Sequence, residues 1–270
     1  MRILLAGILG LLTSMCLAQT HEPMPPQPQR GDVPPRAGHS QSARDGGVRE
    51  TLESIVIPPI PNAPFFATLA TESVKYSPDG ASMTFVNQRH IGRNTQGQIY
   101  EERWYLVPKG SNVKSTMNWI QLADAKARTL YNCSPLKHIC DLLVYDAGDD
   151  LAAATKPLPK PKSVQTEDGS QSIEDLGAQS ILGIETRGIR ETSVTNAGVM
   201  GNDVPLTSLS EYWHSDKFAI NLLSTRSSPF FGKETFTIIE FTPGEPDHHF
   251  FELPAGYQIN DQRKNPPISQ

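Results

Sequence analysis

The chain has 270 residues, a formal net charge of −5 at pH 7 and a hydrophobic content of 37%. This mild acidity gives no support for nucleic-acid binding, which normally needs a basic patch. Beyond the N-terminal apolar run, no segment is long and apolar enough to cross a bilayer as a helix.

Residues 1–18 have the pattern of a signal peptide. Arg2 supplies a positive charge, residues 3–12 form an apolar run, and small residues precede a cleavage point after Ala18. We therefore predict an exported protein, periplasmic or extracellular. Lipid anchoring at Cys16 is the alternative, against which Met15 argues, because a small residue is expected before a lipidated cysteine.

Residues 19–57 are rich in Pro, Gly, Gln and Arg, and we predict a disordered arm, since so few large apolar residues cannot offset the entropy of ordering. The apolar but proline-interrupted residues 55–61 are expected to lie along a sheet edge. A single β-rich domain is predicted over residues 58–258, followed by a flexible tail at 259–270.

The first half of this domain has hairpin patterns. Strands are predicted at residues 65–76, 82–93 and 99–107, because turn sequences such as Ser-Pro-Asp-Gly at 77–80 separate alternating apolar runs. Residues 116–130 are interpreted as two strands with a turn at 124–127, and a short helix is the alternative. A Pro/Lys-rich loop near residues 146–170 follows, which we interpret as an extended, solvated connector within one domain.

The second half repeats the pattern and is the most regular part of the chain. Residues 179–194 alternate with period two and predict one long strand, within which Gly183 and Gly188 suggest a bulge or a close backbone approach. Shorter strands are predicted at 209–214, 218–223 and 234–241. Short connections favour an antiparallel meander over parallel units with helical crossovers. We therefore predict a mainly β fold with little helix, in which the meander forms a strongly curved sheet or half-open barrel.

Cys133 and Cys140 are the cysteines that remain after removal of the signal peptide. In an exported chain this pair predicts a disulfide. The alternative is a metal site that also uses His138, but no fourth ligand is visible nearby. We predict no metal and no cofactor.

Other polar candidates favour ordinary surface roles. Adjacent histidines such as His248 and His249 point in opposite directions on a strand and rarely chelate together, and His214 lies in an aromatic strand. The acidic residues 146–150 lack the spacing of the helix-loop-helix calcium loop. The chain also has no G-x-S-x-G, H-E-x-x-H or phosphate-binding glycine loop, which lowers the expectation of catalysis.

Large side chains at alternate strand positions are candidates for lining a ligand cavity in a curved sheet, although such side chains more often form plain core. The predicted ligand-binding residues are Trp104, Trp119, Tyr212, Phe218 and Phe236.

The C-terminal half resembles a family of exported bacterial proteins of the Acidobacteria type. The matching pieces include residues 188–192 (GIRET), 201–205 (GNDVP), 224–232, 244–247 (GEPD) and 250–257. The resemblance covers most of residues 60–257 and implies export and a β-rich fold, but it brings no activity and no catalytic residues. The meander ending at 251–257 is also similar in layout to the half-barrel carriers that ferry lipoproteins across the periplasm, which cover their concave sheet with helices.

Three hypotheses for function follow. The first is an envelope or secreted protein that binds a lipid-like or apolar ligand in the concave face of the sheet. The second is a structural or interaction module with a fully packed core, whose partner is another envelope protein. An enzyme of unrecognised type is the third.

Overall fold

The computed structural model describes residues 55–77 and 79–263. The chain divides into two units, Met1–Pro34 and Pro35–Gln270, and every described residue belongs to the second. The predicted signal peptide, Cys16 and the arm up to residue 54 lie outside the described residues, as does the end of the predicted tail. Within residues 55–263, no helix is long and apolar enough to span a membrane.

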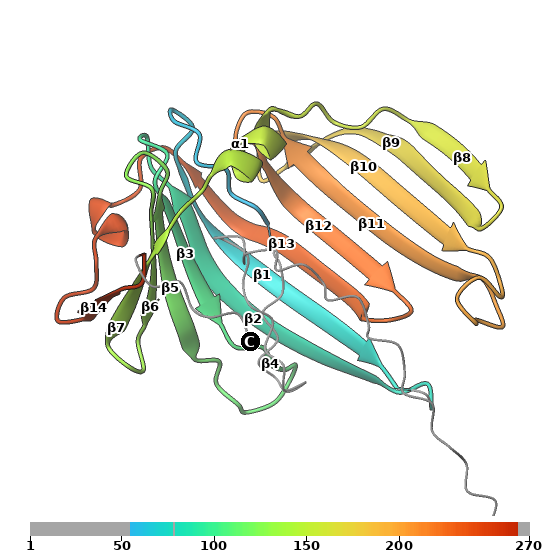
Figure 1. Ribbon diagram of the computed structural model, residues 1–270, viewed down its shortest axis with the longest axis horizontal. Helices are drawn as coiled ribbons and strands as arrows, with labels where there is room; N and C mark the ends of the chain where they lie inside the picture. Colours follow the sequence, from blue (N-terminus) through green and yellow to red (C-terminus); the bar gives the residue numbers. More distant parts are fainter. Residues whose placement is uncertain (1–54, 78, 264–270) are drawn as a thin grey trace, which may run out of the picture. The chain divides into compact units, whose positions relative to one another are not determined.

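The first half of the described chain forms hairpins, as expected (Figure 1). Alternating apolar positions and short turns give seven strands. They are β1 (Phe65–Tyr76), β2 (Ser82–Arg93), β3 (Ile99–Trp104), β4 (Val107–Pro108), β5 (Met117–Asp124), β6 (Thr129–Ser134) and β7 (Ile139–Val144). The two strands favoured over a helix for residues 116–130 are confirmed by β5 and β6.

The second half contributes one helix, one 3-10 turn and seven further strands. They are α1 (Gly148–Thr155), β8 (Lys162–Thr166), β9 (Gly169–Ile181), β10 (Ile184–Thr195), β11 (Leu206–Ser215), β12 (Ile220–Ser228), β13 (Gly232–Pro243), η1 (His248–Phe251) and β14 (Gln258–Asp261). The loop predicted for 146–170 therefore contains α1 and β8. The predicted division at 258/259 falls inside β14.

All strands belong to a 14-stranded sheet with the order β14-β7-β6-β5-β3-β2-β1-β13-β12-β11-β10-β9-β8, while β4 pairs with β2 off this path. Pairing between β1 and β13 joins the two meanders, and the only parallel pair among the described strands is β14 with β7. The strands at the two ends, β14 and β8, do not pair with each other, so the sheet does not close into a barrel. The predicted mainly β, antiparallel, open and curved fold is confirmed.

The single long strand predicted for residues 179–194 is wrong. The chain reverses at Leu182 and Gly183, which have φ angles of 51° and 78°, and β9 and β10 form a hairpin on either side. A two-residue turn with both φ angles positive matches the twist of the flanking strands. The bulge that was one of the two expectations for Gly188 is confirmed, because the β9–β10 register shifts between Gly188 and Ile189. The close neighbour of Gly188 is a side chain and not a backbone, since the Trp213 ring packs over it at 2.7 Å from the position of a Cβ atom.

The hydrophobic core lies against one face of β1, β2, β12 and β13. Phe65, Leu69, Ile91, Phe236 and Ile238 are all at most 2% exposed. Ile55 and Ile57 are buried in the same core, so the N-terminal apolar segment packs inward. The position along a sheet edge that its prolines suggested is therefore wrong.

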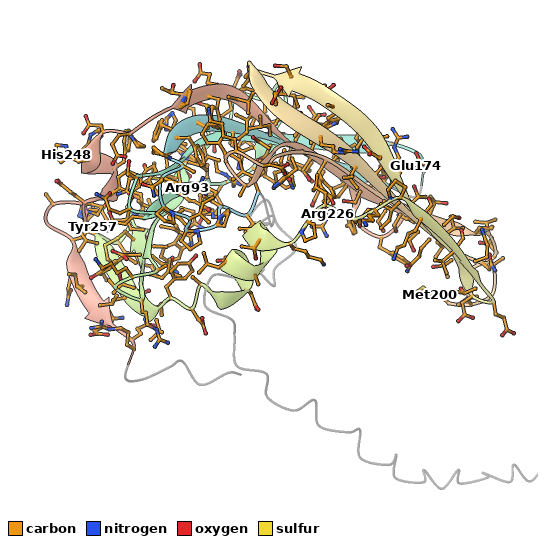
Figure 2. All side chains as sticks on the ribbon, turned by 90° about the horizontal axis from the view of Figure 1, so that it is seen from above. Arg93, Glu174, Met200, Arg226, His248 and Tyr257 are labelled. Atoms are coloured by element: carbon orange, nitrogen blue, oxygen red, sulfur yellow. A yellow bond between two sulfur atoms is a disulfide. The ribbon has the colours of Figure 1, made fainter. Side chains whose placement is uncertain are left out.

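Arg93 links separate chain segments around this core through hydrogen bonds. Its side chain is fully buried and lies over the Phe65 ring at 5.2 Å. It donates hydrogen bonds to the carbonyl oxygens of Pro58 (2.7 Å), Ala63 (2.8 and 3.0 Å) and Phe218 (2.7 Å). Burial lowers the pKa of Arg93 to about 10, so it remains charged at neutral pH. Figure 2 shows Arg93 on the concave side of the sheet, the side on which α1 lies.

The C-terminal segment covers the opposite face. Phe250 of η1 stacks on Phe66 at 4.4 Å and contacts Tyr100 at 5.1 Å, and Tyr257 stacks on His138 at 5.2 Å. Figure 2 shows His248 and Tyr257 on this side. The strand β14 then completes the segment beside β7.

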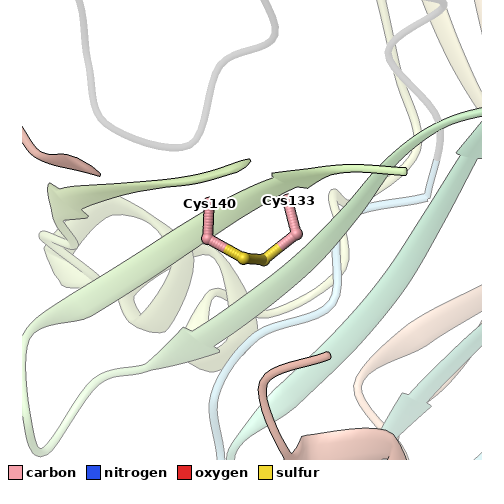
Figure 3. The surroundings of a disulfide bond; sticks show 2 residues. All are labelled: Cys133 and Cys140. Carbon is pink, nitrogen blue, oxygen red and sulfur yellow. A yellow bond between two sulfur atoms is a disulfide. The ribbon is translucent and has the colours of Figure 1, made fainter. Parts of the chain in front are cut away.

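The predicted disulfide between Cys133 and Cys140 is confirmed (Figure 3). The two residues lie directly opposite each other on β6 and β7, with a Cα–Cα distance of 3.9 Å, and both are fully buried. The metal alternative at this position is excluded, because the sulfur atoms that would bind the ion are bonded to each other.

Candidate functional site

One face of the sheet brings together side chains from both meanders, and we call it the inner face. Cross-strand register places its residues in rows, because every second residue of a strand points to the same side. One such row runs through Asn87, Thr71, Phe236, Ser224, Tyr212 and Ile189 on successive strands from β2 to β10.

A segment that we call the strap, residues 148–161, crosses the inner face of β9 to β12. It begins with α1, whose first turn carries Asp149 and Asp150, where acidic side chains favour the positive end of the helix dipole. The buried Tyr145 donates a hydrogen bond from its hydroxyl to Asp150 Oδ2 at 2.8 Å and so ties the helix to the end of β7. Prolines at 157, 159 and 161 prevent the helix from continuing, and the chain runs on in extended form.

Two hollows separate the strap from the sheet. The first has a volume of about 490 Å³ and the second about 510 Å³. Residues 154 and 156–159 of the strap line both hollows, and so does His214 of β11. The two hollows therefore lie along the same length of strap.

The first hollow combines an apolar lining with a few charged groups at its edge. Its apolar members include Val56, Leu158, Ile173, Tyr212 and Ile220. Its charged members are Asp150, Lys156, Lys162 and Glu191. Burial raises the pKa of Tyr212 to about 12, so its hydroxyl stays protonated at neutral pH and can donate a hydrogen bond.

The second hollow is more polar. Arg187 and Asp175 form an ion pair at its wall, which raises the pKa of Arg187 and lowers that of Asp175. Asp216 and Lys160 add further charge, while Ile189 and Leu158 supply apolar surface. A ligand that spans both hollows would therefore meet apolar surface first and charged groups at the far end.

His214 lies between the hollows. Its Nδ1 is 2.9 Å from Asn221 Oδ1, and its Nε2 is 3.9 Å from Asp216 Oδ1. It is not gathered with His248 and His249, which lie in η1 beside Phe250 on the other face of the sheet. Among residues 55–263 no cluster of three or more His, Cys, Asp or Glu side chains is arranged to hold a metal ion.

The predicted ligand-binding residues occupy different environments. Tyr212 lines the first hollow, whereas Phe218 and Phe236 are 2% and 1% exposed in the core. Trp119 is partly buried on the inner face opposite Arg103. Trp104 points to the other face, where its Nε1 donates to Glu102 Oε2 at 2.8 Å.

That second face contains a buried carboxylate, Glu102. Besides Trp104, its donors are the Tyr100 hydroxyl at 2.7 Å and the His90 backbone N–H at 3.0 Å, and His90 Nδ1 lies 3.2 Å away. Burial acts to raise the pKa of Glu102, but these hydrogen bonds together outweigh it and the pKa is lowered. Burial, together with the hydrogen bond to Glu102 and the charge of that carboxylate, raises the pKa of Tyr100. With its acceptors committed, this cluster is structural.

The strap is the part of the site that sequence reasoning missed. Residues 156–162 (KPLPKPK) were interpreted as a solvated connector, and the lysines are indeed exposed. The signal was Leu158, a single large apolar residue among prolines and lysines, which is partly buried in the hollow wall. An extended proline-rich segment can present one side to a sheet and the other to solvent.

No protein-family model matches the chain, and no curated protein matches it in sequence. Among solved structures, the chain is similar to MucB in its complex with MucA from Pseudomonas aeruginosa, with a TM-score of 0.37 and 14% identity over 74% of this chain and 58% of that one. It thus spans less than two thirds of the MucB chain.

Two other solved structures also match the chain. LprF from Mycobacterium bovis matches with a TM-score of 0.29 and 14% identity, over 73% of this chain and 90% of that one. An outer membrane lipoprotein-sorting protein domain from Vibrio parahaemolyticus matches with a TM-score of 0.17 and 10% identity, over 69% of this chain and 88% of that one. At these values we base no inference about this chain on the likeness.

Proposed function

We propose that this chain is an exported binding protein that holds an apolar or amphiphilic ligand on the inner face of its sheet, beneath the strap. The observation that carries the proposal is the pair of hollows under residues 154–161, about 490 and 510 Å³ in volume. Small-molecule sites typically measure about 300–1,000 Å³ and are mostly apolar with a few placed polar groups. The lining of the first hollow fits that description.

The strap supports a ligand role in a second way. Its lysines are exposed and border the hollows, and its prolines stiffen it, so the strap forms an open cover over the sheet face that a ligand could occupy. Predicted export places such a protein where free lipids and other apolar molecules need a carrier through water. The hollow is bounded by Tyr212, so one of the five predicted ligand-binding residues is retained at this position.

The test compares two tryptophan substitutions on α1. Ala154 lines both hollows, whereas Ala152 is exposed on the same helix. Binding of a fluorescent apolar probe, N-phenyl-1-naphthylamine, would be titrated into the wild-type protein, Ala154→Trp and Ala152→Trp. We expect Ala154→Trp to weaken binding at least tenfold and Ala152→Trp to leave it unchanged.

Native mass spectrometry of protein exported to a bacterial periplasm and purified without detergent gives an independent reading. An added mass released on activation would support the proposal and identify the ligand class. A clean mass, together with no probe binding by the wild-type protein, would contradict it.

A protein-interaction role is the second candidate, and exposed apolar side chains at neighbouring turns favour it. Phe230, in the turn before β13, is 68% exposed, and Met200, in the loop before β11, is 64% exposed. A Phe230→Ser variant that loses a partner while keeping probe binding would favour this candidate.

A further inference from the structure

Arg89 is a buried cation on the inner face, near the middle of β2. Arg89 is 5% exposed, and its direct cross-strand neighbour on β1 is the core residue Leu69. Burial, with a further contribution from Arg103, lowers its pKa to about 9, so it remains charged at neutral pH. A buried charge of this kind normally has a partner, because desolvation is costly.

Within the described part of the chain, Arg89 has no such partner at two of its nitrogens. Nε and Nη2 are buried and make no hydrogen bond. The nearby carboxylates are already engaged: Glu101 pairs with Arg103 at 2.7 Å, and Glu102 accepts its hydrogen bonds on the opposite face. Glu101 and Glu102 offset part of the Arg89 charge and act to raise its pKa, but neither accepts a hydrogen bond from Nε or Nη2.

Nε and Nη2 are the two donors on one side of the guanidinium plane. They are spaced to bind both oxygens of a carboxylate, or two oxygens of a phosphate, through parallel hydrogen bonds. A water molecule can accept from these donors but carries no negative charge, so it matches a buried cation less well than an oxyanion does. The geometry of the unpaired atoms therefore indicates an oxyanion.

Three more unpaired polar atoms lie on the adjacent positions. Thr71 Oγ1 and Ser73 Oγ on β1 and Asn87 Oδ1 on β2 are buried and make no hydrogen bond to any described residue. Thr71 is paired directly with Asn87 and is a diagonal neighbour of Arg89, which places these three side chains within reach of one another. Ser73 lies one inner-face position further along β1, opposite Phe85 and diagonal to Asn87. Buried polar atoms are nearly always hydrogen-bonded, so five exceptions on four neighbouring residues are not accounted for by chance.

We propose that Arg89, Thr71, Ser73 and Asn87 form a binding site for an oxyanion, a carboxylate or a phosphate group, carried at the end of an apolar ligand. Arg89 holds two oxygens of the anion, and the two hydroxyls donate to it. Asn87 Oδ1 accepts a hydrogen bond from a hydroxyl of the ligand, while its amide nitrogen stays bound to the Trp104 carbonyl at 2.7 Å.

The apolar part of the ligand is assigned from the surroundings. Leu69 and Phe236 lie directly beside the polar group, and the row through Asn87, Thr71 and Phe236 leads on to Tyr212 in the first hollow. Four strand spacings of about 4.8 Å separate Asn87 from Tyr212, and this span of about 19 Å matches the length of a long acyl chain. Because Phe236 lies between them and is 1% exposed, an acyl chain on this path would have to displace the Phe236 side chain. In this respect alone the inference rests on the proposed function.

The experiment follows the thermal midpoint and the binding isotherm of the full chain with five probes: palmitate, lysophosphatidate, methyl palmitate, hexadecanol and inorganic phosphate. Each is tested on the wild-type protein, on Arg89→Met and on Arg226→Met. Arg226 is the matched control, because it is an exposed arginine on the inner face of β12. Arg89→Lys tests whether the paired Nε and Nη2 donors are needed, since an ammonium cannot donate two parallel hydrogen bonds to one anion.

We expect palmitate or lysophosphatidate to bind the wild-type protein at least tenfold more tightly than the uncharged probes. This preference should disappear in Arg89→Met, be largely lost in Arg89→Lys and persist in Arg226→Met. Palmitate alone would identify a carboxylate, and lysophosphatidate or phosphate alone a phosphate group. In the absence of ligand, Arg89→Met should melt about 2–4 °C higher, because an unpaired buried charge is removed.

Other outcomes separate the two proposals. Equal binding of charged and uncharged lipids by the wild-type protein and Arg89→Met would overturn the oxyanion site and leave the proposed function standing. Arg89-dependent binding of phosphate without binding of any lipid would support the oxyanion site and contradict the apolar-ligand proposal. A lower melting temperature of ligand-free Arg89→Met with unchanged binding would show that Arg89 is structural.

Discussion

Two buried arginines on the same face of β2 differ in whether the chain supplies their hydrogen-bond acceptors. Arg93 donates to three backbone carbonyls from segments far apart in the chain. The Nε and Nη2 atoms of Arg89 reach no acceptor among the described residues. A buried charge that the chain satisfies holds the fold together, whereas one that it leaves unsatisfied costs stability and points to a ligand.

The largest expected effect is at the satisfied arginine. Arg93→Met removes a charged donor from the carbonyl oxygens of Pro58, Ala63 and Phe218 and leaves Phe65 without its cation, so the free energy of unfolding should fall by about 3–5 kcal/mol. Urea denaturation measures this. Arg93→Lys should recover little, since a single ammonium cannot reach carbonyls of Pro58, Ala63 and Phe218 together. A decrease in the free energy of unfolding of less than about 1 kcal/mol would contradict this stabilising role of Arg93.

Glu102 extends the comparison to a buried anion that the chain satisfies. Glu102→Gln should lower the free energy of unfolding by about 2 kcal/mol at neutral pH, because charge-assisted hydrogen bonds from Tyr100 and Trp104 are lost. The folded-state pKa of Glu102 is lowered, so its contribution is present above its unfolded pKa of about 4.3 and is lost as the pH falls through the folded value.

Denaturation midpoints between pH 7 and pH 3 test this sign. The difference between wild type and Glu102→Gln should be constant from pH 7 to about pH 5 and shrink at lower pH. A difference that grows on acidification would mean that Glu102 is protonated in the folded protein.

Removing the disulfide tests how far the stability of the fold depends on the β6–β7 hairpin. Replacing both Cys133 and Cys140 with serine opens a short loop and should cost about 2 kcal/mol. Because this hairpin lies several strands away from β9 to β12, probe binding under the strap should be unchanged at temperatures where the protein stays folded. Loss of binding in the folded variant would show that the two meanders are coupled.

The smallest expected effect has the opposite sign. Arg89→Met should raise the free energy of unfolding of the ligand-free protein by about 1 kcal/mol, since the apolar replacement needs no partner. Chemical denaturation of lipid-free protein checks this. A loss of stability as large as that of Arg93→Met would remove the contrast between the two arginines.

The hairpins were predictable because their signals are local. Alternating residues and turn sequences such as the one at 77–80 specify where strands start and stop, and they placed β1, β2, β5 and β6 close to their observed positions. The error at residues 179–194 arose because Leu182 occupies a left-handed position that glycine or asparagine usually fills. Period-two alternation continues through such a turn and hides it.

The candidate site was much less predictable. Of the residues proposed for ligand binding, Tyr212 lines a hollow, but Phe218 and Phe236 are packed in the core. An apolar residue on a strand has the same local pattern whether a ligand or another side chain covers it. Arg89 gave no signal at all, because the sequence around it reads as a solvated strand, and its burial depends on residues far from it in the chain.

By itself, the sequence determined a mainly β fold built from short-range hairpins and a disulfide between Cys133 and Cys140, and it predicts export. The hairpins depend on residues close together in the chain, and the two remaining cysteines allow only one pairing. The tertiary structure alone decided that β1 pairs with β13, that the strap covers β9 to β12, and that Arg93 is satisfied while Arg89 is not. The pairing of β1 with β13 and the hydrogen bond from Arg93 to Phe218 join residues more than a hundred positions apart, and no local pattern records which distant partner will share a buried space.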